Sequence, residues 1–148
     1  SVKSPIFVGV ERILSIDYGK KRVGLAVSDP LQIIASGLDT IAPANLMDFL
    51  KNYFERETVS TIVVGYPLGL DGNATDATQM VEKLIVQLKK TFPAQQVVQQ
   101  DERFTSVEAK KIILQSGVRK KRRRDKALVD KVSAVLILQD YLEANRQY

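Results

Sequence analysis

The sequence predicts an α/β fold: a mixed five-stranded sheet flanked by helices. Two observations lead to this prediction. Up to residue 41, short apolar runs are separated by turns, whereas several later segments carry their apolar residues at helical spacing. The resulting order, three strands followed by alternating helices and strands, is typical of a sheet covered by helices. A chain of 148 residues is long enough to close one hydrophobic core around such a sheet.

The first three strands are predicted at residues 12–17, 23–28 and 32–41. The turn Tyr18–Arg22 joins the first two strands, and Asp29-Pro30 marks the bend before the third. Because both connections are short, we expect the three strands to pair as an antiparallel meander.

The remaining elements alternate between helix and strand. Residues 61–65 form a continuous apolar run, as in strands buried on both faces of a sheet, and residues 96–100 resemble a shorter strand. Helices are expected where apolar residues recur every three or four positions. These helices include residues 43–54, 80–90, 105–117 and 127–143.

Residues 12–148 are expected to form a single domain, preceded by an N-terminal extension, residues 1–11, that need not belong to the native protein. The extension lacks the basic start, apolar stretch and cleavage site of a signal peptide. No apolar run approaches the roughly 18 residues that span a bilayer. The chain has no cysteine, which fits a reducing compartment. We therefore expect a cytoplasmic protein that does not enter membranes.

The absence of histidine limits the chemistry of the chain, because histidine is the usual general base and the commonest metal ligand. Without cysteine, thiolate catalysis and cysteine-bound zinc are excluded as well. Any hydrolysis must therefore depend on carboxylates, hydroxyls, lysines or a metal-activated water.

Three acids from separate segments are the candidate catalytic and metal-binding residues: Asp17, Glu102 and Asp130. Asp17 ends the first strand and Glu102 follows the last one, so both are expected at the carboxyl edge of the sheet, where open α/β sheets bind ligands. Asp130 precedes an almost unbroken apolar helical stretch, so we expect it to be partly buried, and paired or metal-bound. Carboxylates without histidine favour the hard cations Mg²⁺ or Mn²⁺.

Each acid also has an ordinary structural explanation. Asp17 can be a turn residue that ends a strand, and Glu102 can pair with Arg103 or favour the start of the next helix. Asp130 can be satisfied by Lys131 or Ser133. The combination of the three acids with a basic region favours catalysis more strongly than any one of the acids does.

The net charge of +5 is concentrated in one region. Residues 103–131 contain eleven Lys and Arg and three acids, a local balance of +8. A localised cationic region is typical of a polyanion contact, with a solvated loop as the alternative. The cations predicted to contact nucleic acid are Lys20, Lys21, Arg22, Arg103, Arg119, Lys120, Lys121, Arg122, Arg123 and Arg124.

Four motifs occur in order, at residues 16–29 (IDYGKKRVGLAVSD), 63–72 (VVGYPLGLDG), 101–106 (DERFTS) and 130–142 (DKVSAVLILQDYL). Together they resemble the bacterial YqgF/RuvX family over nearly the whole chain. The resemblance implies an RNase H-like fold in which Asp17, Glu102 and Asp130 match the acidic residues of the family. It also implies a metal-dependent nuclease that matures the 5′ end of precursor 16S ribosomal RNA or resolves Holliday junctions, which are branched DNA. A homodimer would suit a symmetric four-way junction.

Many nucleases of the wider RNase H-like superfamily carry an acid at the end of the fourth strand, where this chain has Gly65-Tyr66-Pro67. The second acid must then be Glu102 or the loop residue Asp71, and the number of metal ions and the role of Asp101 stay open. Two other functions are considered. One is a non-catalytic ribosome-assembly factor that binds nucleic acid. The other is an actin-like ATPase-type domain, because Asp17-Tyr-Gly before a hairpin resembles the phosphate loop of that superfamily.

Overall fold

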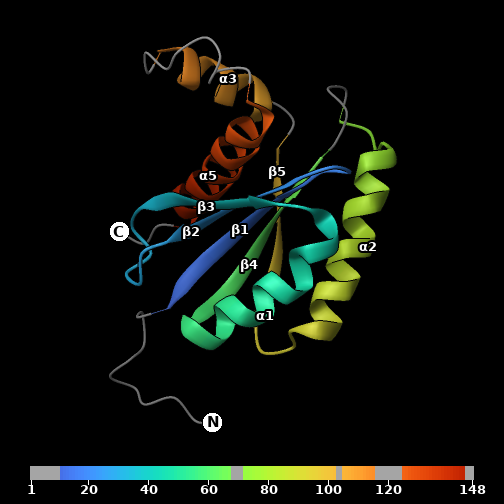
Figure 1. Ribbon diagram of the computed structural model, residues 1–148, viewed down its shortest axis with the longest axis vertical. Helices are drawn as coiled ribbons and strands as arrows, with labels where there is room; N and C mark the ends of the chain where they lie inside the picture. Colours follow the sequence, from blue (N-terminus) through green and yellow to red (C-terminus); the bar gives the residue numbers. More distant parts are fainter. Residues whose placement is uncertain (1–10, 68–71, 103–104, 116–124, 146–148) are drawn as a thin grey trace.

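The computed structural model describes residues 11–67, 72–102, 105–115 and 125–145. Its strands form one mixed sheet in the order β3-β2-β1-β4-β5 (Figure 1). The strands are β1 (Arg12–Tyr18), β2 (Val23–Ser28), β3 (Ala35–Ile41), β4 (Val59–Tyr66) and β5 (Gln96–Asp101). The first three strands pair antiparallel, and β4 and β5 extend the sheet in parallel with β1. The predicted meander and the mixed five-stranded sheet are confirmed.

Helices cover both faces of this sheet. In the described residues they are α1 (Leu46–Arg56), α2 (Asp76–Thr91), α3 (Thr105–Gln115) and α5 (Lys126–Ala144), with the short 3-10 helix η2 (Pro43–Asn45) before α1. Helices α1 and α2 lie on one face, whereas α5 lies on the other with α3 packed against it (Figure 1). None of these described helices is both long enough and apolar enough to cross a membrane.

The alternation of side chains along β1 places its final acid on the α5 side of the sheet. Leu14 and Ile16 are fully buried under α1 and α2. Ser15 points the other way, because its Oγ donates a hydrogen bond to the backbone oxygen of Ala134 in α5 at 2.7 Å. The next residue on that face is Asp17.

The same period applies to β4 and β5. Val63 and Val98 pack in the apolar cluster under α5. Gly65 lies two positions after Val63 and Glu102 four positions after Val98, so both belong to the same side of the sheet. The parallel pairing brings the carboxyl ends of β1, β4 and β5 to one edge of the sheet. Sequence periodicity and topology therefore direct Asp17, Gly65 and Glu102 to one place.

The predicted start of the third strand at residue 32 is wrong, because β3 begins at Ala35. The preceding segment folds around Asp29, whose carboxylate accepts hydrogen bonds from backbone N–H groups of residues 31, 33 and 34 at 3.1, 2.7 and 2.7 Å. These bonds lower the pKa of Asp29, with the one from Ile34 contributing most. Gln32 also has a φ of 60°, which no strand residue adopts. The apolar run 31–34 is therefore a loop.

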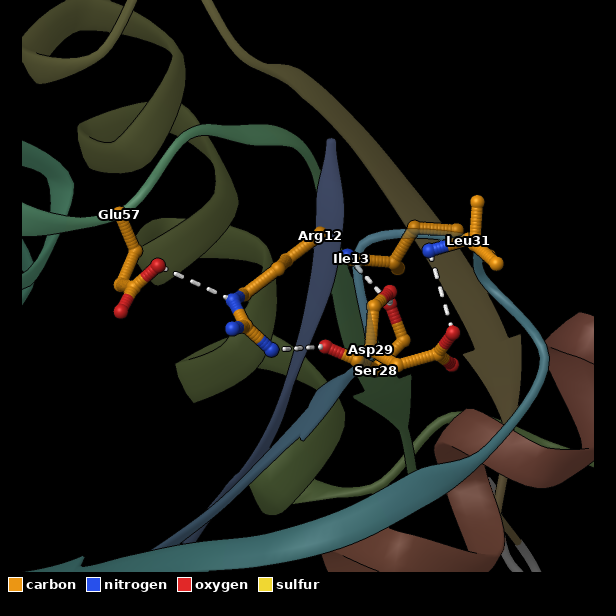
Figure 2. Close-up of polar contacts among 6 residues, drawn as sticks. All are labelled: Arg12, Ile13, Ser28, Asp29, Leu31 and Glu57. Atoms are coloured by element: carbon orange, nitrogen blue, oxygen red, sulfur yellow. Dashed lines mark hydrogen bonds and ion pairs between the residues drawn. The ribbon is translucent and has the colours of Figure 1, made fainter. Parts of the chain in front are cut away.

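A polar network ties the amino end of β1 to its surroundings (Figure 2). Arg12 donates from Nε to Glu57 Oε2 at 3.2 Å and from Nη1 to the Ser28 backbone oxygen at 3.1 Å. The backbone N–H of Ile13 donates to Ser28 Oγ at 2.8 Å. This network is at the opposite end of β1 from Asp17, so it holds the strand without entering the candidate site.

Candidate active site

Asp17 and Glu102 meet across the end of β4. Their strands are not neighbours, because β4 runs between β1 and β5 and places Gly65 there. A Cβ atom at Gly65 would lie 2.7 Å from Glu102 Oε2, so the Glu102 carboxyl occupies the space that a side chain at that position would fill. A side-chain hydrogen bond joins Glu102 to Asp17. The fourth strand has no acid at its end, and the carboxyl of Glu102 reaches over from the end of β5 to the space beside Gly65.

The surroundings of the two carboxyl groups raise the pKa of both. Burial raises the pKa of Asp17 to about 6, against a smaller lowering by the hydrogen bond from Glu102, and the charge of Asp130 adds to the rise. Burial, followed by the charge of Asp17, raises the pKa of Glu102 further still. Protonated Glu102 therefore donates to the Asp17 carboxylate. No Lys or Arg in the described part of the chain is among the groups that shift either pKa.

Asp130 reaches this edge of the sheet from the start of α5. The helix approaches β2 closely, since a Cβ atom at Gly24 would lie only 2.1 Å from the Asp130 backbone oxygen. Gly24 is in turn the β2 residue that pairs with Asp17. Asp130 is therefore near enough for its charge to raise the pKa of Asp17.

The side-chain partner of Asp130 is Arg22, whose Nε donates to Oδ2 at 2.7 Å. Lys131 and Ser133, the partners considered from the sequence, do not bind the Asp130 carboxylate in the described structure. The methylenes of Lys131 lie against Gly37, within 2.6 Å of where its Cβ would be. Ser133 Oγ is buried and has no hydrogen-bond partner among the described residues. Sequence reasoning placed Arg22 among the nucleic-acid contacts and did not connect it with Asp130.

The two paired acids have the chemistry of a site for a divalent cation. Asp17 and Glu102 are adjacent carboxyl groups with raised pKa values, which no cationic side chain of the described residues lowers. Such a pair has the chemistry of a site where a cation replaces a proton. A complete set of three acidic ligands is not formed within the described ranges. Asp130 stands beside the pair with its carboxylate bound to Arg22. The residues therefore fit a cation at Asp17 and Glu102, with Asp130 as a neighbour.

The other predicted site residues divide into two groups. Lys20 and Lys21 are exposed on the turn before Arg22, and Asp101 is exposed at the end of β5, where its charge contributes to the raised pKa of Glu102. The remaining ones lie outside the described residues: Asp71, Arg103, Arg119, Lys120, Lys121, Arg122, Arg123 and Arg124. Sequence reasoning missed the role of Gly65, although a glycine inside a strand is a general sign of close approach.

The most prominent groove lies elsewhere. It has a volume of about 550 Å³ and is lined by Ile13, Leu31, Ile33 and Tyr141, among others. Ile13 is at the amino end of β1, opposite to the acids, and none of the three candidate acids lines the groove. Because it lacks carboxylates, this groove does not alter the choice of site.

Comparison with known proteins identifies relatives over almost the whole chain. The family model described as "RuvX: Holliday junction resolvase" matches residues 11–144. A Flavobacterium johnsoniae protein named "Putative pre-16S rRNA nuclease" is 46% identical over 135 residues, covering 91% of this chain and 98% of that protein. A Porphyromonas gingivalis protein of the same name is 48% identical over 132 residues, covering 89% of this chain and 96% of that protein.

The structure of Thermus thermophilus RuvC in complex with a Holliday junction substrate is similar to this one with a TM-score of 0.53 and 15% identity, over 91% of this chain and 96% of RuvC. At this identity the likeness concerns the fold alone, and it confirms the predicted RNase H-like fold. The family match and the relatives, each covered over nearly its full length, show that the chain belongs to the RuvX family.

Proposed function

We propose that this protein is a metal-dependent nuclease that hydrolyses phosphodiester bonds in structured nucleic acid, and that its substrate is the 5′ end of precursor 16S ribosomal RNA. One observation carries the proposal: the carboxyl groups of Asp17 and Glu102 are joined by a hydrogen bond at the carboxyl edge of an RNase H-like sheet, with Asp130 beside them. The family description and the names of the relatives, which denote nucleases, support the same reaction class.

Asp17 and Glu102 would hold Mg²⁺ or Mn²⁺, because these cations prefer oxygen ligands, and Asp130 is the third candidate ligand. When bound, such a cation supplies stabilisation of phosphate charge and a more acidic water. Because the proton on Glu102 must leave before both carboxylates can bind, the cation affinity should rise with pH.

The backbone supports Glu102 in the position that this chemistry needs. Strands β4 and β5 stay paired up to Tyr66 and Asp101, and the Glu102 N–H donates to the Tyr66 backbone oxygen at 3.4 Å. The carboxyl therefore projects from the end of a paired strand, over Gly65, and not from an isolated loop. A site held in this way requires little rearrangement when substrate arrives.

The choice of substrate depends on the relatives. Those that are nearly half identical to this chain carry the name of a precursor 16S rRNA nuclease, which favours RNA and a cytoplasmic role in ribosome biogenesis. The family description names Holliday junctions, for which a homodimer would be suited to a two-fold symmetric substrate. Both substrates belong in the same assay.

The test is a side-by-side cleavage assay on a precursor 16S rRNA fragment and on a four-way DNA junction, with Mg²⁺ or Mn²⁺ and with EDTA. We expect cation-dependent cleavage of the RNA at its 5′ end by the wild type and by Asp48→Asn, which alters an exposed acid of α1. Cleavage of the junction alone would make the protein a resolvase. Binding of either substrate without cleavage under all conditions would favour a non-catalytic assembly factor.

A further inference from the structure

Arg22 is fixed at the head of β2 by the tight turn that follows β1. The N–H of Gly19 donates to the Arg22 backbone oxygen at 2.9 Å. A Cβ atom at Gly19 would lie 2.9 Å from that same oxygen, so the turn depends on a residue without a side chain. The two residues that flank the turn, Tyr18 of β1 and Val23 of β2, pair with each other in the sheet. The Arg22 backbone is therefore fixed a few residues from Asp17.

The Arg22 side chain reaches the start of α5 and binds Asp130 through Nε and Oδ2, 2.7 Å apart. The side chains are 36% and 24% exposed, so both partners contact solvent. Arg22 is not among the causes that shift the pKa of Asp17 or Glu102. It therefore neutralises the one acid of the three that does not take part in the hydrogen bond between Asp17 and Glu102.

A pair with this exposure is easily exchanged for another partner. Because both side chains already contact water, a competing ligand can separate the pair without leaving a fully buried charge unpaired. A guanidinium binds phosphate through two parallel hydrogen bonds, which makes a nucleic-acid backbone a natural competitor of Asp130. The released carboxylate would then lie beside Asp17 and Glu102 without its Arg22 partner.

We propose that Arg22 is a positioning residue that holds Asp130 back from the cation until a phosphate of the nucleic acid takes its place. Cation binding and nucleic-acid binding are then coupled, and each strengthens the other by the same factor. This inference rests on the proposed function, because it needs Asp130 as the third ligand. Arg22 then has two partners in turn: Asp130 in the free protein, and a phosphate, as the sequence predicts for this residue, when nucleic acid is bound.

The first test is a double-mutant cycle on Mn²⁺ affinity, measured by calorimetry without nucleic acid. Because Arg22 holds Asp130 in the free protein, Asp130→Asn should change the affinity of the wild type by no more than about twofold. Arg22→Gln should raise the affinity about tenfold, within the usual range of coupling between sites, and Asp130→Asn in that background should abolish the gain. Equal effects of Asp130→Asn in both backgrounds would overturn the proposal, because Arg22 would then act by its charge alone.

Two further variants control this cycle. Lys21→Gln removes the same charge from the same turn, but Lys21 is exposed, and we expect less than half of the Arg22→Gln gain. Arg22→Lys keeps the charge but lacks the Nε–H that binds Asp130, so it should also raise the Mn²⁺ affinity. This second variant keeps the test valid if Arg22→Gln does not fold. If Asp17→Asn binds Mn²⁺ as the wild type does, the proposed function itself fails, whatever the cycle gives.

The second test measures the reciprocal effect. The affinity for a labelled RNA duplex, followed by fluorescence anisotropy with and without Mn²⁺, should rise with Mn²⁺ about tenfold more in the wild type than in Arg22→Gln. Mn²⁺ screens the RNA equally for every variant, so the difference between variants in the Mn²⁺ effect on RNA affinity measures the coupling. A gel run afterwards shows whether the duplex is intact. The same Mn²⁺ effect in both proteins would overturn the proposal.

Discussion

Asp17 and Glu102 destabilise the protein in the absence of a cation, because burial and mutual repulsion oppose their ionisation. The folded-state pKa of Asp17 is about 6, against an ordinary value of 3.8. Between these values the folded protein binds more protons than the unfolded chain, so the free energy of unfolding falls as the pH rises. The shift at Asp17 alone corresponds to roughly 3 kcal/mol. The fall continues above pH 6 because Glu102 titrates higher still.

Urea denaturation in EDTA at about pH 5 and about pH 8 measures this loss of stability. The wild type should be less stable at the higher pH, and Glu102→Gln, which cannot ionise, should lose much less. Asp48→Asn removes an exposed acid of α1 and should follow the wild type. If Glu102→Gln keeps the full wild-type dependence on pH, the two acids do not raise each other's pKa.

The meeting of Asp17 and Glu102 at one edge of the sheet was predictable from the sequence, because each lies at the carboxyl end of a predicted strand. The contact between Arg22 and Asp130 was not predictable, since 108 positions separate the two residues. Their meeting depends on how closely α5 approaches β2 at Gly24, and hydrophobic periodicity does not report such a distance.

At the scale of elements, the glycine of β4 decides whether the acids can meet. A Cβ atom at Gly65 would lie 2.7 Å from both Glu102 Oε2 and Ile137 Cδ1. Gly65→Ala should therefore lower stability by roughly 1–3 kcal/mol, as overpacking does, and displace the Glu102 carboxyl. We expect cleavage of the precursor RNA to fall further than the unfolded fraction explains. Urea denaturation and cleavage rates on the same preparation measure both effects.

Gly37→Ala provides a matched control on the same face of the sheet. Its Cβ atom would meet Lys131 Cδ at 2.6 Å, but that atom belongs to a flexible side chain that can move aside. Both stability and cleavage should stay near those of the wild type. Equal losses in the two variants would mean that Gly65 matters for packing alone.

The order of strands and helices followed from periodicity, whereas two features of the sheet did not. The loop before β3 is apolar, and it is excluded from the strand by the hydrogen bonds that Asp29 accepts and by the positive φ of Gln32. The position of β4 between β1 and β5 depends on long-range pairing, which spacing along the chain does not encode. The sequence therefore placed Asp17 and Glu102 at one edge of the sheet but did not predict that one reaches the other across a third strand.

At the scale of the whole molecule, the uneven charge predicts how the protein binds nucleic acid. The stretch Arg119–Arg124 lies outside the described residues, so its role as a phosphate contact stays a prediction from the sequence. Binding should follow counterion release, with a log-log salt slope of roughly −0.9 per phosphate neutralised on duplex DNA and about −0.7 on single strands.

Changing Arg122, Arg123 and Arg124 to Gln should weaken binding to all sequences alike and make the salt slope shallower by about two to three units. Thermal stability should barely move, because the substitutions leave the described core unchanged. Affinity against salt concentration, for the wild type and the triple variant on one duplex, measures the effect. An unchanged slope would assign this stretch to solvent or to a protein partner.

The most direct test of the carboxylate mechanism compares Asp17→Asn with the wild type in cleavage of the precursor RNA over a range of Mn²⁺ concentrations. The amide keeps the shape of the side chain but removes the charge that attracts the cation. Because loss of an outer hydrogen-bond partner of a metal ligand already costs about 10- to 100-fold, we expect loss of a ligand to cost at least about 100-fold. EDTA should abolish the wild-type activity. Cleavage by purified Asp17→Asn at the wild-type rate, or undiminished cleavage after exhaustive chelation, would contradict metal-dependent catalysis by these acids.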